Sequence, residues 1–125
     1  METILKDINA VAGVTGSFVC DAGGQVMARV LPDALDRKLL IPAARTIAQT
    51  IEGLKIAQQD PIGDIDLLYD NGRLIIKSLD GSYLCIMCVQ RINIPLLNLT
   101  ANVAAKKLGK MVKELQRIAL FRSVH

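Results

Sequence analysis

Apolar residues form three short runs between Ile65 and Val89, and two turn sequences separate them. The dipeptides Asn71-Gly72 and Asp80-Gly81 suit two-residue hairpin turns, in which the backbone takes positive φ. The pattern therefore predicts a three-stranded antiparallel meander. Its last strand, Tyr83 to Val89, is apolar on both faces, which predicts a central strand that is covered on both sides.

The N-terminal part predicts a short helix and a hairpin. Apolar residues at helical spacing over Met1 to Ala12 predict a helix that stops at Gly13. Two strands, Val14 to Cys20 and Gln25 to Leu31, follow and are joined by a Gly-rich turn. Simple alternation places one set of side chains of the second strand on a single face: Val26, Ala28 and Val30.

Two longer helices complete the pattern. The first opens at Pro32-Asp33, with Asp33 as a cap, and Pro42 predicts a break near Ile41 with a main helix from Pro42 to Ala57. Its apolar stripe consists of Leu40, Ala44, Ile47, Ile51 and Leu54.

The last helix is expected to start at a cap formed by Asn93 or Asn98. At about 1.5 Å per residue it is longer than five strands are wide, so its end is expected to overhang the sheet. Its stripe consists of Leu97, Ala101, Ala104, Leu108, Met111, Leu115 and Ile118. A coiled coil is the alternative interpretation of this stripe.

The order helix, two strands, helix, three strands, helix predicts a single α/β domain of the α+β type over residues 1–125. We expect a five-stranded antiparallel sheet between helix layers.

Composition narrows the possible functions. The 125 residues suit one domain, and an aromatic content of 3% argues against single-stranded nucleic-acid binding, which needs stacking platforms. No apolar run is long enough for a membrane span, and an odd cysteine number of 3 does not suggest a disulfide framework. With no signal-peptide pattern at METILKDI, the expected location is the cytoplasm.

No group of residues predicts catalysis, a cofactor or a metal. Cys85 and Cys88 have C-x-x-C spacing, but residues three apart on a strand point to opposite faces, so packing is the better interpretation. The acids near Asp66 match no calcium loop. The single histidine, His125, is the last residue. The chain also lacks the glycine motifs of nucleotide-binding loops, so we expect a protein that is not an enzyme.

Several short motifs, taken with the element order, resemble the Roadblock/dynein light chain family. They are Val14-Thr15-Gly16 at the first strand, the hairpin sequence DAGGQVMAR from Asp21 to Arg29, and Asn98-Leu99-Thr100 at the last helix. The resemblance covers about Leu5 to Leu115 and is that of a prokaryotic single-domain member.

The resemblance implies a profilin-like fold and a homodimer whose sheets join edge to edge through the third strand. It further implies that the second helices lie together on one face, while the first and last helices cover the other. It also implies a non-enzymatic protein that binds small Ras-like GTPases. The implied edge strand consists of Asp64, Ile65, Asp66, Leu67, Leu68, Tyr69 and Asp70.

The acidic residues of this strand conflict with such pairing. If two copies paired antiparallel about Leu67, Asp64 would face Asp70 of the other copy, which is unfavourable. Three explanations remain open: a different register, Lys and Arg supplied by the second helix, or acids that block edge pairing.

Two charged surfaces are candidates for partner contact. The outer face of the second helix is either an ordinary mixed surface or a GTPase-facing platform: Lys38, Ile41, Arg45, Gln49 and Glu52. The last helix is either solvated on its basic face or contacts an acidic partner or an anionic surface: Lys106, Lys107, Lys110, Lys113 and Arg117.

The leading functional hypothesis is a homodimer that binds a small GTPase and modulates its nucleotide cycle. The alternative is a structural adaptor in a motor or membrane-associated complex. A third hypothesis is a small-ligand sensor with a pocket beside the sheet.

Overall fold

The computed structural model describes residues 1–33, 40–58 and 64–124. A five-stranded antiparallel sheet has the order β2-β1-β5-β4-β3, which confirms the predicted fold class. The elements are α1 (Glu2–Asn9), β1 (Val14–Asp21), β2 (Val26–Val30), α3 (Leu40–Gln58), β3 (Ile65–Tyr69), β4 (Gly72–Ser78), β5 (Ser82–Cys88) and α4 (Ile94–Val124).

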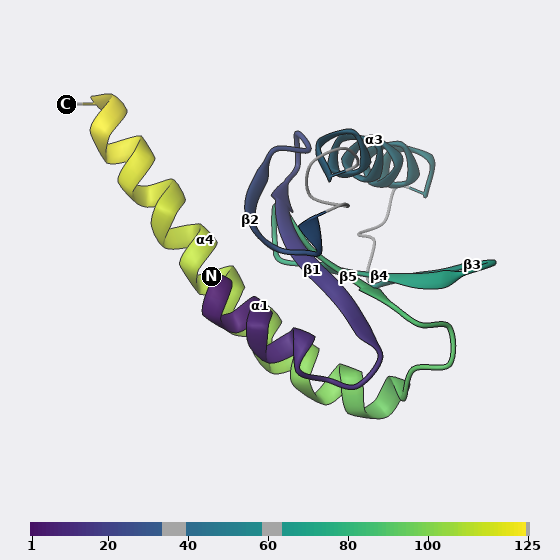
Figure 1. The fold of residues 1–125 in the computed structure, drawn as a ribbon. Helices are drawn as coiled ribbons and strands as arrows, with labels where there is room; N and C mark the ends of the chain where they lie inside the picture. The colour runs from purple at the N-terminus through teal and green to yellow at the C-terminus, as the bar shows by residue number, and fades with distance from the viewer. Residues whose placement is uncertain (34–39, 59–63, 125) are drawn as a thin grey trace.

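Helices cover both faces of the sheet: α1 and α4 lie on one side and α3 on the other (Figure 1). The central strand β5 sends Leu84 and Ile86 into the α1/α4 side and Cys85 into the α3 side. All three side chains are fully buried. The prediction of a doubly covered central strand is confirmed.

One of the two predicted turns is correct and the other is displaced. Asp80 (φ 61°) and Gly81 (φ 101°) form the β4–β5 turn with the positive φ values that the dipeptide predicts. At the β3–β4 turn, however, Tyr69 pairs with Gly72. The two loop residues are therefore Asp70 and Asn71, and Gly72 already belongs to β4, so this turn lies one residue earlier than predicted.

A bulge breaks the simple alternation that we expected on β2. Val19 pairs with Ala28 and Cys20 pairs with Val26, so Met27 is an extra residue without a partner. Because a bulge displaces the following side chains, Val26 packs on the α3 side while Ala28 packs on the α1/α4 side. The shared face predicted for these residues is wrong at Val26.

The first helix is shorter than predicted. It ends at Asn9, and Gly13 (φ 95°) lies in the turn that follows instead of directly after the last helical turn. Two side-chain hydrogen bonds fix Asn9 at this end of the helix. The Asn9 side-chain amide donates to the Val30 carbonyl at 3.0 Å, and the Ser17 hydroxyl donates to Asn9 Oδ1 at 2.8 Å. These bonds hold the end of α1 over β1 and β2.

The described part of α3 begins at Leu40, with Pro42 close to its start. Leu40, Ala44 and Ile51 are buried against the sheet as predicted. Leu54 remains 37% exposed, so the predicted stripe does not bury its last member. The expected helix opening involves residues 34–39, which lie outside the described residues. A break is predicted near Ile41, but Ile41 and Pro42 themselves are helical, and the described part of α3 begins at Leu40.

The last helix is capped by Asn93, whose side chain accepts a hydrogen bond from the Leu96 N–H at 3.1 Å. Its buried stripe runs through Leu97 and Leu108 to Val112. Met111 is 40% exposed, so its predicted place in the core is wrong and Val112 takes it. Either position continues the three-to-four residue spacing of the stripe, and the direction in which the helix faces the sheet decides which of the two is buried.

Beyond Val112 the helix extends past the sheet, as its length predicted (Figure 1). Leu115 is 48% and Ile118 is 43% exposed, so this end is not covered by the rest of the described chain.

A matched pair of substitutions on α4 tests where the core ends. Replacing the fully buried Leu108 by Ala is expected to lower the free energy of unfolding by about 2–5 kcal/mol. The same change at Leu115 is expected to alter it by no more than about 0.5 kcal/mol, because the side chain is half exposed. Urea denaturation followed by circular dichroism measures both, and equal losses would show that the end of α4 is covered.

Candidate partner-binding surfaces

Among the strands of the described residues, β3 lies at one edge of the sheet and is hydrogen-bonded to β4 alone. Its two faces differ. Ile65, Leu67 and Tyr69 point towards α3, while Asp64 and Asp66 point to the face that α1 and α4 cover. The predicted alternation of an apolar and an acidic face is therefore present.

The apolar face of β3 borders a narrow hollow against α3. Its volume is about 140 Å³, and its lining is almost entirely apolar. Leu67 is 39% and Tyr69 51% exposed, and Leu54 of α3 adds a third exposed side chain. An unpaired strand edge beside exposed apolar side chains is a typical place for another chain to bind.

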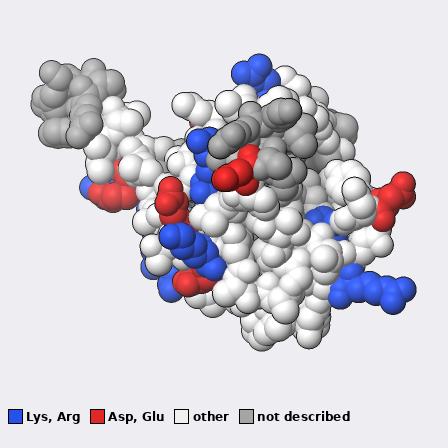
Figure 2. Space-filling view, in the orientation of Figure 1, with Lys and Arg blue, Asp and Glu red and all other residues white. Residues whose placement is uncertain are grey.

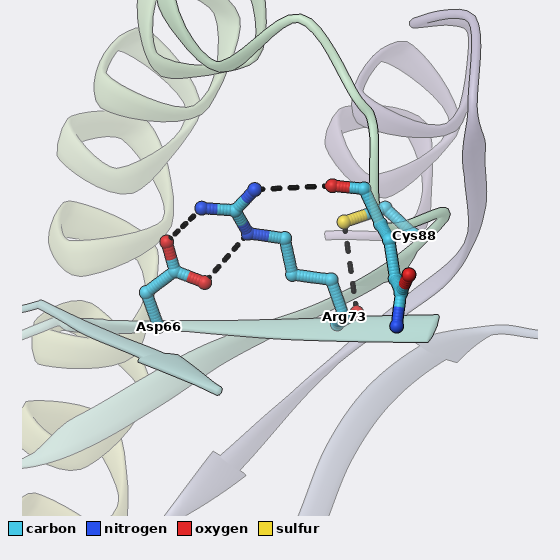
Figure 3. Close-up of polar contacts among 4 residues, drawn as sticks. Asp66, Arg73 and Cys88 are labelled. Atoms are coloured by element: carbon cyan, nitrogen blue, oxygen red, sulfur yellow. Dashed lines mark hydrogen bonds and ion pairs between the residues drawn. The ribbon is translucent and has the colours of Figure 1, made fainter. Parts of the chain in front are cut away.

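Cations of β4 neutralise two acids at this edge: Asp64, which directly precedes β3, and Asp66 of β3. Lys77 Nζ lies 2.6 Å from Asp64 Oδ2, and the Lys77 side chain is only 4% exposed. Arg73 forms a two-bonded ion pair with Asp66, in which Nε donates to Oδ1 at 2.7 Å (Figure 3). A further guanidinium N–H donates to the Gln90 carbonyl at 3.1 Å.

The hydrogen bonds from the Arg73 guanidinium hold the pKa of Asp66 below its ordinary value. The carboxylate therefore stays ionised at neutral pH, and the pair persists. The Cys88 thiol donates to the Arg73 carbonyl at 3.6 Å, which ties β4 to β5 beside this pair (Figure 3).

These ion pairs change the expected repulsion between two copies of the acidic edge strand. The cations come from β4 and not from α3, so the structure offers an explanation that we did not expect. The β3–β4 register decides which cation meets which acid. It pairs Leu68 with Arg73, which places Arg73 diagonal to Asp66, and one step beyond the Ile65–Ile76 pair it places Lys77 opposite Asp64. Alternating charges along β4 were the available signal, but their use required the correct register.

The predicted platform residues on α3 are exposed, but they do not face β3. Ile41, 60% exposed, and Arg45 border a hollow of about 400 Å³ above the β1–β2 turn. Gly24 (φ 85°) lets this turn approach α3, because a Cβ there would lie 2.6 Å from the Arg45 Cα. Gln49 and Glu52 are also exposed, whereas Lys38 lies outside the described residues.

Arg29 of β2 lines the same hollow as Arg45, a neighbour that the sequence pattern does not predict. The two arginines are brought together only by the packing of α3 on the hairpin. The flank of α3 with Ile41 and Arg45, named the platform flank here, is distinct from the flank with Thr50 and Leu54, which borders β3. We name the second the dimer flank, after the edge-to-edge dimer that the family resemblance implies.

The cysteines pack as predicted, with one unforeseen contact. Cys85 and Cys88 lie on opposite faces of the sheet. Cys85 instead donates a hydrogen bond to Cys20, which lowers the pKa of Cys20 and raises that of Cys85. Within residues 1–33, 40–58 and 64–124, no group of three or more His, Cys, Asp or Glu could hold a metal ion, and no helix could cross a membrane.

Solved structures with the same architecture include a Roadblock/LC7 domain from Streptomyces avermitilis, with a TM-score of 0.76 and 11% identity. The match covers 90% of this chain and 98% of that domain. The chain has the Roadblock/LC7 fold. The gliding protein MglB from Thermus thermophilus shares the Roadblock/LC7 architecture of this chain with a TM-score of 0.79 and 13% identity, over 90% of this chain and 88% of that one.

The profilin-like character of the fold is also confirmed. Acanthamoeba castellanii profilin IA matches with a TM-score of 0.59 and 12% identity, over 88% of this chain and 96% of that one. No family model and no curated protein matches the sequence.

Of the two ion pairs, Lys77–Asp64 should contribute more to the free energy of unfolding than Arg73–Asp66, because the Lys77 side chain is nearly buried. Replacing Asp64 by Ala leaves the ammonium group without its partner, so we expect a loss of about 1–3 kcal/mol in the free energy of unfolding. Asp70→Ala is the matched control, because Asp70 has no ion pair within the described ranges, and should change it by no more than about 0.5 kcal/mol. Urea denaturation measures both, and equal effects would contradict the role of Lys77.

Proposed function

We propose that this protein is a non-enzymatic homodimer that binds a small Ras-like GTPase and modulates its nucleotide cycle. The observation that carries the proposal is the edge strand β3, which combines a free edge, exposed apolar side chains and internally neutralised acids. The Roadblock fold supports it, since the family resemblance implies edge-to-edge dimers that serve GTPases.

The dimer is supported by the chemistry of the edge. Asp64 and Asp66 each have a cation from β4, so approach of a second β3 adds less like-charge repulsion than the bare sequence indicates. Burial of Leu54, Leu67 and Tyr69 between the two copies would remove apolar surface from water. The dimer flank of α3 would then lie beside its counterpart.

The GTPase site is proposed on the platform flank of α3. Dimerisation through β3 leaves Ile41 and Arg45 accessible, because they lie over the β1–β2 turn at the other side of the helix. An exposed aliphatic side chain beside two arginines suits a partner with a mixed apolar and acidic surface. Each subunit of the dimer would offer one such flank.

A charge placed on the apolar face of β3 tests the homodimer. Sedimentation equilibrium of the wild-type protein is expected to give twice the 13.6 kDa mass of one chain. Tyr69→Glu should weaken the dimer at least about tenfold, because a carboxylate would be buried between the copies. Leu99→Glu, at an exposed apolar position on α4 away from β3, is the control and should leave the mass unchanged. A monomeric wild-type protein would refute the dimer.

A charge reversal on the platform flank tests the partner. GTP hydrolysis and nucleotide release are measured for a Ras-like GTPase that the tagged protein captures from its native host, with and without the protein. Arg45→Glu is expected to lower the affinity at least about tenfold without loss of folding, since the position is exposed. Arg91→Glu, an exposed cation away from α3, serves as the matched control. Equal affinity of the Arg45→Glu variant would remove this site from the proposal.

The second candidate function is that of a structural adaptor in a motor or membrane-associated complex. The extension of α4 past the sheet favours it, because this end offers exposed apolar and basic side chains away from β3 and α3. A dimer that leaves the nucleotide cycle of the GTPase unchanged would decide for the adaptor.

A further inference from the structure

The outer face of α4 has an apolar half and a basic half in direct succession. Leu96, Leu99 and Val103 are 47%, 70% and 55% exposed. The following turns of the same face carry Lys106, Lys107 and Lys110, which continue the three-to-four residue spacing and are also exposed.

A shallow groove accompanies the apolar half. It lies between α1 and α4, has a volume of about 320 Å³, and takes Ile4, Leu99 and Val103 into its lining. Asp7 and Lys107 are its charged members. Leu99 and Val103 belong both to the groove and to the apolar half. The two helices α1 and α4 that border the groove form one outer layer of the fold (Figure 1).

The three lysines are available for an external anion. Lys113 pairs with Asp80 at 3.3 Å and Arg117 with Glu114 at 3.4 Å, but Lys106, Lys107 and Lys110 have neither ion pair nor hydrogen bond in the described part of the chain. In Figure 2, Lys and Arg atoms lie along the α1/α4 side of the molecule, with carboxylates among them.

We propose that this outer face of α4 binds the surface of an anionic phospholipid bilayer. The lysine ammonium groups would contact lipid phosphates while their alkyl stems and the three aliphatic side chains enter the interface. The inference concerns a surface that the proposed GTPase binding does not use.

A bilayer fits this surface better than an acidic protein segment does. Every point of a bilayer supplies both apolar chains and anionic headgroups, so the succession of an apolar and a basic half needs no matching order in the partner. A protein segment would have to place its apolar residues and its acids in the same succession. The cationic charge of α4 also favours an anionic surface.

Flotation of the full chain with lipid vesicles tests the proposal. Vesicles of phosphatidylcholine are compared with vesicles of an equal mixture of phosphatidylcholine and phosphatidylglycerol. The wild-type protein is expected to bind only the second kind, and added salt should weaken the binding because it screens exposed charges.

Two pairs of substitutions locate the contact. Lys107→Gln with Lys110→Gln should lower the partition coefficient about 25-fold, because each lysine near an anionic surface contributes a factor of about five. Arg29→Gln with Arg45→Gln removes the same net charge from the α3 side of the molecule and should have little effect. Similar losses in both double variants would show attraction by net charge alone and would overturn the assignment.

The apolar half needs its own test. Leu99→Ser should lower binding about tenfold or more, because an exposed leucine would otherwise enter the interface. Leu115→Ser on another face of α4 is the control, and circular dichroism checks that both variants fold. Unchanged binding of the Leu99→Ser variant would refute the proposal. A wild-type protein that does not bind the vesicles with phosphatidylglycerol would also refute it, and would favour an acidic protein as the partner of this face.

Discussion

Strand β5 has to bury side chains on both faces, and the arrangement of the other elements depends on this requirement. Leu84 and Ile86 need one helix layer and Cys85 needs another, so α1 and α4 lie on one side and α3 on the other. With β5 in the centre, β2 and β3 become the edges of the sheet. The free edge of β3 is therefore a consequence of how the core is built.

Charge neutralisation within the sheet determines what this edge can do. A strand that carries Asp66, with Asp64 before it and Asp70 after it, would normally discourage pairing. Lys77 and Arg73 of β4 compensate the first two, and the exposed leucine and tyrosine of the opposite face remain. The acids thus mainly hold β3 on β4, and the apolar face is the part that is available to another chain.

The helix α3 separates two possible contacts. One flank borders β3, and the other lies over the β1–β2 turn, where Gly24 permits close approach to Arg45. On the other side of the sheet, α4 presents a third surface of different chemistry. The three proposed contacts, with a second copy, with a partner protein and with a lipid surface, therefore use different residues.

Sequence alone determined the elements, the doubly covered strand and the Asp80-Gly81 turn, because apolar periodicity and turn chemistry are local properties. It also indicated the overhang of α4 from length alone. Only the tertiary structure decided the β3–β4 register, the bulge at Met27 and the choice of Val112 over Met111. These depend on the packing of distant segments, and the β3–β4 register decides which cations meet Asp64 and Asp66. The placement of Arg29 and Arg45 in one hollow also depends on distant packing, since no local sequence pattern predicts how a helix lies on a hairpin.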